Sequence, residues 1–202
     1  MAMSLLNIDK REAILNATLE LLSCCGFHGF SIKQLAAKAN VATGTVYLYF
    51  EDRDTLIREL HRTIMQRFAK AIFTDHDPHQ NLASQHHRLC CNLWHFLIEN
   101  PTILLSKVQF DHLPPDVLRS HRDEAWSLLQ PLTALFEVGR VQGTIKNLPD
   151  DVLAGLSFEP LVYLARQHAI GVIEIEPDNL HELVHASWDA IAKRQSVAEE
   201  IL

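Results

Sequence analysis

Apolar residues recur every three to four positions along most of the chain, which is the spacing of helices that bury one face. The clearest case begins at Asp52, where five apolar residues follow at intervals of four: Leu56, Leu60, Ile64, Phe68 and Ile72. Strand-like alternation is confined to residues 172–175, and one short strand without a partner does not make a sheet, so we expect an extended loop there. The pattern predicts an all-α protein.

The N-terminal part contains two helices with clear ends. The first is expected to begin at Asp9 and to end at Gly26, since glycine commonly terminates helices. The second is expected to begin at Ser31, because the Ser-x-x-Gln spacing to Gln34 is that of a capping box, and to end near Ala39.

A turn of about three residues leads from the second helix to a third. The turn begins at Asn40, and asparagine is the residue other than glycine that most readily adopts a positive φ. Thr43 is expected to cap the third helix, which extends to Tyr49. Two short helices joined in this way are typical of a helix-turn-helix, whose second helix enters the major groove of DNA.

The segment of residues 30–50, followed by Arg53 and Leu56, resembles the DNA-binding domain of the tetracycline-repressor (TetR) family. The likeness covers residues 9–70 and is most specific in the third helix, at Gly44-x-x-Tyr47-x-Tyr49-Phe50. Two positions depart from the family pattern. Asn40 stands where most members have glycine, and Arg53 stands where lysine is commoner.

A recognition helix enters the groove by its N-terminal end, so the residues that open the third helix are expected to lie nearest the bases. Tyrosine hydroxyls on that helix and basic side chains on either side suit phosphate contacts. The candidate DNA contacts are Ser31, Lys33, Thr43, Gly44, Thr45, Tyr47, Tyr49 and Arg53. The alternative is core packing for the tyrosines and a solvated surface position for Lys33.

No recognisable motif occurs after the first seventy residues. Further helices are expected at residues 81–99, 102–110, 115–119, 123–141, 150–170 and 178–193. The resemblance implies a helix-turn-helix DNA-binding domain at residues 9–69 and a helical ligand-binding and dimerisation domain at residues 74–202.

The last two predicted helices are too apolar to bury every face within one subunit, so we expect a homodimer built on a two-fold four-helix bundle. A monomeric core is the alternative. In the family a ligand lies among the middle helices, and their aromatic residues either line such a pocket or simply pack. These candidates are Trp94, Phe96, Phe110, Trp126 and Phe136.

A histidine and cysteine cluster stands out on the predicted helix 81–99: His86, His87, Cys90, Cys91 and His95. Several of these residues are four apart and share a helix face, so they could hold zinc, nickel or copper, or act as a thiol sensor. The alternative is a helix with buried cysteines and outward histidines. We favour packing and expect no metal, because a closed site needs a further ligand that the sequence does not place.

The net charge of −7 at first argues against nucleic-acid binding. Residues 1–73, however, carry nine Lys and Arg against seven Asp and Glu, whereas residues 74–202 carry nine against eighteen. The acidic excess therefore belongs to the second part. Charge asymmetry of this kind is consistent with two parts that have different tasks.

Several classes of protein are disfavoured. The sequence lacks a P-loop, a Gly-x-Ser-x-Gly motif and a His-Glu-x-x-His motif, so we expect no enzymatic activity and no cofactor. No run of about 20 apolar residues indicates a membrane span. The cysteines form two adjacent pairs, Cys24-Cys25 and Cys90-Cys91, rather than a disulfide framework, which favours a cytoplasmic protein.

The sequence thus predicts a dimeric transcription regulator, acting as a repressor that a small-molecule effector releases from a palindromic double-stranded DNA operator. Two alternatives stay open. One is a metal- or thiol-sensing regulator that uses the histidine and cysteine cluster, and the other is a helical protein-interaction module without a DNA role. The sequence identifies neither the effector nor the operator.

Overall fold

The computed structural model describes residues 2–193, with side chains described from Lys10 onward, and confirms the all-α prediction. Contacts divide the chain into two compact units. The first comprises the residues up to Ala69 together with Glu99–Leu128, and the second comprises Lys70–Ile98 together with the residues from Leu129 on. The division tests neither of the functional boundaries expected from the sequence, which stay predictions.

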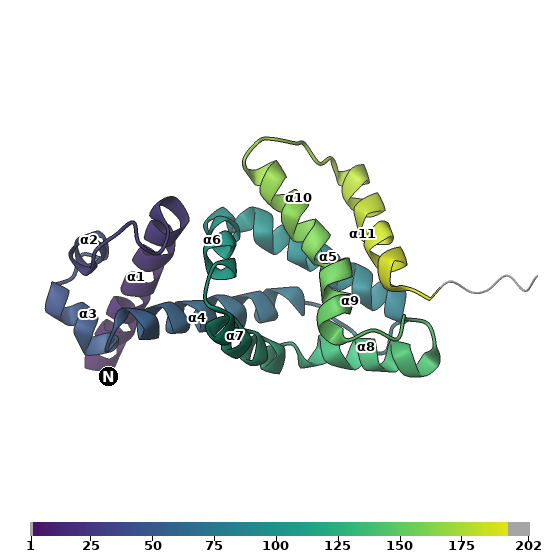
Figure 1. Ribbon diagram of the computed structural model, residues 1–202, viewed down its shortest axis with the longest axis horizontal. Helices are drawn as coiled ribbons and strands as arrows, with labels where there is room; N and C mark the ends of the chain where they lie inside the picture. Colours follow the sequence, from purple (N-terminus) through teal and green to yellow (C-terminus); the bar gives the residue numbers. More distant parts are fainter. Residues whose placement is uncertain (1, 194–202) are drawn as a thin grey trace, which may run out of the picture. The chain divides into compact units, whose positions relative to one another are not determined.

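The first unit holds the predicted helix-turn-helix. Its helices are α1 (Ala2–Cys25), α2 (Ile32–Lys38), α3 (Thr43–Tyr49), most of α4 (Arg53–Ile72), α6 (Pro101–Asp111) and α7 (Pro115–Leu128). Helix α1 packs against α2 and α6, and α2 packs against α3 (Figure 1). Fully buried leucine and isoleucine side chains from α1, α2 and α4 form its core: Ile14, Leu22, Leu35 and Leu56.

Two helix starts in this unit differ from the prediction. Asp9 does not begin α1, which is already helical from Ala2, because residues 2–8 contain no glycine or proline to stop it. Thr43 is the first residue inside α3 rather than its cap, and Ala42 occupies the cap position without a side-chain hydrogen bond. The Asp52 start is confirmed, since its Oδ1 accepts a 2.7 Å hydrogen bond from the Thr55 backbone N–H.

The second unit contains α5 (Leu82–Glu99), α8 (Gln130–Gln142), α9 (Asp150–Ser157), α10 (Glu159–Ala169) and α11 (Pro177–Ile191). Helices α9, α10 and α11 pack against one another, and α8 contacts α9 (Figure 1). Phe136, Leu153 and Leu161 are among its largest fully buried side chains.

Three predicted helices have different bounds in the structure. The helices expected at residues 115–119 and 123–141 are instead α7 and α8, which meet at Leu129, because Pro131 cannot continue α7 and suits the first turn of α8. The helix expected at residues 150–170 breaks at Phe158 for the same reason, since Pro160 lies in the first turn of α10. Periodicity alone does not register such breaks, because the apolar face continues across them.

The expected extended loop at residues 172–175 is confirmed, since no strand is found among the described residues. An isolated antiparallel β-bridge pairs Ile145 with Ala192, outside this loop. No helix in the described part of the chain is both long and apolar enough to cross a membrane.

Candidate nucleic-acid interface

Helix α2 begins with the predicted capping box. The Ser31 hydroxyl accepts a 3.2 Å hydrogen bond from the Gln34 backbone N–H, and Gln34 Oε1 accepts a 2.7 Å hydrogen bond from the Ser31 backbone N–H. Phe30 and Leu35, on either side of the cap, are both buried, as a hydrophobic staple requires. The Ser31 side chain, a candidate DNA contact, therefore already fixes the start of α2.

The turn between α2 and α3 confirms the role predicted for Asn40, whose φ is 54°. Its N–H donates to the Ala37 carbonyl at 3.2 Å, and the Val41 N–H donates to the Ala36 carbonyl at 2.9 Å. This pair of bonds is a Schellman motif, which satisfies the last carbonyls of α2 and reverses the chain within a few residues. The motif fixes the angle at which α3 leaves the turn.

Helix α3 presents polar side chains outward while Val46 anchors it to the core. Thr43 and Gly44 are exposed, Thr45 is half-buried, and Tyr47 is 54% exposed. A Cβ at Gly44 would meet no atom within 4 Å, so the surface in front of the helix is open there. Four of the candidate contacts thus lie together on one short helix.

Two further residues of α3 complete that surface. Tyr49 is half-buried, and its ring lies 6.5 Å from that of Phe50 between centroids, so it also belongs to the packing that supports α3. Leu48 is 84% exposed, and the sequence reasoning did not include it. A solvent-facing leucine beside Tyr47 suits an apolar contact with a thymine methyl group. The sequence pattern could have identified Leu48, because it is an apolar residue on the otherwise polar side of the predicted helix.

The two basic candidates occupy different settings. Lys33 is exposed on the first turn of α2. The Arg53 guanidinium is half-buried and donates hydrogen bonds to the Phe27 carbonyl and, at 3.1 Å, to the Phe30 carbonyl. It also lies 4.4 Å from the centroid of the Phe30 ring. Arg53 therefore ties α4 to the segment before α2, and its contact with phosphate stays a prediction.

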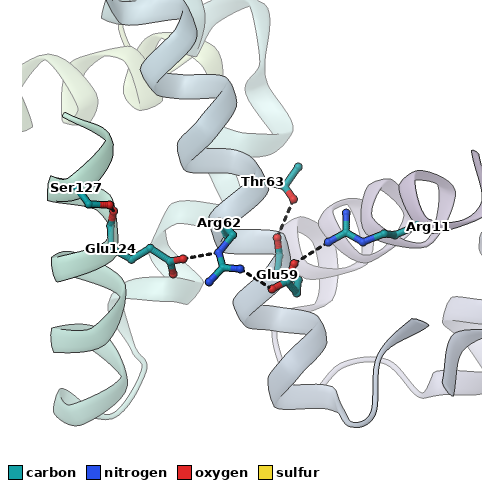
Figure 2. A network of polar contacts seen from close by, with 6 residues as sticks. All are labelled: Arg11, Glu59, Arg62, Thr63, Glu124 and Ser127. Atoms are coloured by element: carbon teal, nitrogen blue, oxygen red, sulfur yellow. Dashed lines mark hydrogen bonds and ion pairs between the residues drawn. The ribbon is translucent and has the colours of Figure 1, made fainter. Parts of the chain in front are cut away.

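A chain of alternating charges connects α1, α4 and α7 within the first unit (Figure 2). Glu59 forms salt bridges with Arg11 of α1 at 2.6 Å and with Arg62 on its own helix at 3.1 Å. Arg62 also pairs with Glu124 of α7. Since one carboxylate and one guanidinium each serve two partners, a displacement of either flanking helix alters the whole chain of contacts.

The aromatic residues expected to line a pocket do not fall in one compact unit. Phe110 and Trp126 belong to the first unit, whereas the other three candidates belong to the second. Phe136 is fully buried, and Trp94 and Phe96 are nearly so, as packed core residues are. Their contact with a ligand stays a prediction.

The histidine and cysteine cluster of α5 divides between the core and the surface. Cys90 is fully buried as predicted, and burial raises the pKa of its thiol to about 12. His86 is fully buried too, contrary to the outward position expected, because its ring packs between Phe158 and Trp188. Burial lowers the pKa of His86 to about 4, which keeps the ring neutral.

His87 and Cys91 are half-buried and His95 is exposed, so Cys91 does not have the fully buried position expected of the cysteines. Among the side chains that the structure describes, no group of three or more His, Cys, Asp or Glu could hold a metal ion.

Comparison with known proteins identifies both parts of the chain. Residues 14–60 match the bacterial regulatory proteins of the tetR family, and residues 81–192 match a tetracyclin repressor-like C-terminal domain. A relative from Haemophilus influenzae, named an uncharacterized HTH-type transcriptional regulator, is 30% identical over 187 residues, which cover 92% of this chain and 97% of that protein.

Solved structures agree with these matches. A TetR-family transcriptional regulator from Vibrio parahaemolyticus is 33% identical with a TM-score of 0.81, over 92% of this chain and all of that one (100%). A tetR-family transcription regulator from a Shewanella species is 26% identical, also with a TM-score of 0.81, over 92% of this chain and 99% of that one. The likeness therefore extends through both units.

Proposed function

This chain belongs to the TetR family of transcriptional regulators, and on that premise we propose that it is a homodimeric repressor, released from a palindromic operator by a small-molecule effector. Membership makes it a helix-turn-helix DNA-binding regulator and not an enzyme. The oligomeric state, the effector and the direction of regulation belong to the proposal.

The outward face of α3 carries the proposal. Thr43, Gly44, Thr45 and Tyr47 lie together on a helix anchored by Val46, which is the arrangement that a major-groove reader needs. In our proposal the threonines and the glycine approach base edges, and Tyr47 reaches the phosphate backbone. Lys33, Ser31 and Tyr49 flank this set, and Arg53, at the start of α4, is the further candidate for a phosphate contact.

Exposed apolar side chains on α9 and α10 support a dimer. Tyr163 is 61% exposed and Leu156 is 41% exposed, and Val152 belongs to the same set. Covering such side chains removes apolar surface from water, which favours association. A dimer also supplies two recognition helices, and one short helix alone reads too few base pairs for a specific site.

The proposed switch acts through α4. Effector binding favours one of two arrangements of this helix and so changes the distance between the two recognition helices of the dimer. A coupling of ~1–3 kcal/mol is enough to change operator affinity by ~5- to 150-fold. The contacts of Glu59 and Arg62 join α4 to its neighbours in the first unit and are suited to transmit such a shift.

The experiment is a gel-shift titration with DNA from upstream of the chain's own gene. Tyr47→Ala and Gly44→Trp should each weaken binding at least ~10-fold. Both positions are exposed, so neither change disturbs the core. Asn16→Ala, an exposed change on α1, serves as the matched control and should bind normally. Retention of full operator affinity by both α3 variants would reject the assigned reading surface.

A further inference from the structure

Three imidazole rings from two helices form a hydrogen-bonded row on the second unit. His87 lies on α5, while His181 and His185 lie one helical turn apart on α11. His87 Nε2 is 3.5 Å from His181 Nδ1, and His181 Nε2 is 3.1 Å from His185 Nε2. At its other end the row meets Cys91, whose Sγ lies 3.7 Å from His87 Nδ1. Because His181 turns opposite ring nitrogens toward its two neighbours, the rings follow one another in a line and do not surround a common point.

One of the two directions open to this row leaves a hydrogen-bond donor at its end. A neutral imidazole carries one N–H and one lone pair, so each ring donates to the next when the Cys91 thiol donates to His87. His181 then donates through Nε2 to His185, whose own hydrogen is on Nδ1, beyond the last contact of the row. Hydrogen bonds in a chain polarise one another, which strengthens this terminal donor. An acceptor beside His185 therefore favours this direction.

A hollow of about 330 Å³ opens beside the row on the surface of the second unit. The three histidines line it together with Ser84, Arg88 and Trp188. Ser84 and Arg88 come from the first two turns of α5 and are exposed, as are His181 and His185 of α11. A solute therefore reaches polar atoms of both helices from solvent without displacing a buried side chain.

The wall of this hollow is positively charged although it lies in an acidic part of the chain. Residues 74–202 carry eighteen Asp and Glu against nine Lys and Arg, yet no Asp or Glu is among the residues that line the hollow. The Arg88 guanidinium makes no ion pair with any side chain that the structure describes. A guanidinium is always charged and carries five N–H donors. A permanent positive charge without a carboxylate partner, beside donors from a second helix, suits an anion.

We propose that the hollow binds a phosphoryl group, as free phosphate or as part of an organic phosphomonoester. Arg88 supplies the charge and a pair of parallel N–H donors, and the Ser84 hydroxyl and the His185 ring supply donors from either side. A phosphoryl group presents at least three acceptor oxygens in different directions, so it accepts hydrogen bonds from both helices at once. A planar carboxylate presents only two oxygens and matches such a wall less well.

A neighbouring hollow has room for the organic part of a phosphomonoester. Its volume is about 440 Å³, and it shares Gln80, Ala83 and Trp188 with the first hollow. Its wall continues over Leu82 and over Val138, whose side chain is 43% exposed. An apolar group attached to the phosphate would therefore contact the Trp188 side chain and remove apolar surface from water. We expect a phosphomonoester to bind more tightly than phosphate alone.

The test is calorimetry on the untagged full-length protein in phosphate-free buffer without DNA, with inorganic phosphate and phenyl phosphate as separate probes. Both should bind at one site per chain, and phenyl phosphate should bind about 3- to 10-fold more tightly, whereas equal affinities would identify free phosphate as the ligand. Arg88→Gln should weaken both at least ~10-fold. Arg119→Gln removes an exposed positive charge from α7, outside the hollow, and serves as the matched control that should bind normally.

Nitrogen-15 NMR of the histidine rings adds a readout at the site itself. Phenyl phosphate should shift the ring nitrogens of His185 more than those of His95, an exposed histidine of α5 that does not line the hollow. Equal affinities of wild type and Arg88→Gln, or shifts no larger at His185 than at His95, would overturn the proposal. Because no DNA is present, the outcome is independent of the proposed repressor function.

Discussion

Arg53 lies over the ring of Phe30, with the guanidinium carbon 4.4 Å from the ring centroid, and also donates a hydrogen bond to the Phe30 carbonyl. A second hydrogen bond runs from the same guanidinium to the Phe27 carbonyl. One side chain at the start of α4 thus holds the segment that precedes α2. Arg53 thereby ties the start of α4 to the helix-turn-helix, while its contact with phosphate stays a prediction.

The planar geometry of the Arg53 guanidinium should contribute more to the stability of the fold than its charge does. We expect Arg53→Lys to lower the free energy of unfolding by about 1–2 kcal/mol, because an ammonium cannot make both carbonyl contacts while stacking on a ring. Arg53→Ala should cost at least as much. Urea denaturation measures both effects. Wild-type stability in the lysine variant, combined with weaker DNA binding in the alanine variant, would instead assign Arg53 to phosphate.

Lys33 should contribute to DNA binding through charge alone. Lys33→Ala should weaken binding to all DNA sequences similarly and reduce the slope of log affinity against log salt by about 1, because one fewer phosphate is neutralised. Lys38→Ala is the matched control, since Lys38 is paired with Glu20 at 2.6 Å. Filter binding between low and moderate salt gives both slopes. Identical slopes for wild type and Lys33→Ala would remove Lys33 from the contact set.

A stacked histidine pair should make stability depend on pH. His61 of α4 and His121 of α7 lie 4.3 Å apart between ring centroids. Burial lowers the pKa of His61 to about 4, with a further contribution from His121, and burial also lowers the pKa of His121. The unfolded chain, with an ordinary histidine pKa near 6.5, therefore takes up the proton first as the pH falls.

The folded state should accordingly lose stability as the pH falls from about 6.5 toward 4. The His61→Phe variant keeps a ring at this position. Between pH 7 and pH 4.5 we expect its free energy of unfolding to fall by about 2 kcal/mol less than that of the wild type. Urea denaturation across this range measures the difference. Parallel stability curves for the two proteins would contradict the expected protonation behaviour of His61.

Replacing two helical glycines by alanine should change the stability of the fold in opposite directions. A Cβ at Gly139 of α8 would lie 2.3 Å from Cδ1 of Ile145, a fully buried residue, whereas a Cβ at Gly155 of α9 would meet no atom within 4 Å. We expect Gly139→Ala to cost about 1–3 kcal/mol through overpacking and Gly155→Ala to add about 0.5–1 kcal/mol through helix propensity. Thermal unfolding tests the pair. Stabilisation by Gly139→Ala would mean that Ile145 repacks freely.

Local patterns accounted for the helix-turn-helix because its determinants lie within about twenty residues. The capping box of Ser31 with Gln34 and the positive φ of Asn40 are near-neighbour effects, so the spacing of residue types was enough to predict them. The bounds of α9 and α10 were predicted less well, because an apolar face continued across the break beside Pro160.

Contacts between distant segments required the tertiary structure. Helical spacing placed His87 and Cys91 on one face of α5. His87 Nε2 also lies 3.5 Å from His181 Nδ1, ninety-four positions further along the chain, and no local periodicity relates two helices that far apart. The contacts of Arg53 with Phe30 likewise came only from the tertiary structure, since its charge alone predicted a phosphate contact, which stays a prediction. Residue type sets what a side chain is able to bind, and packing determines which partner reaches it.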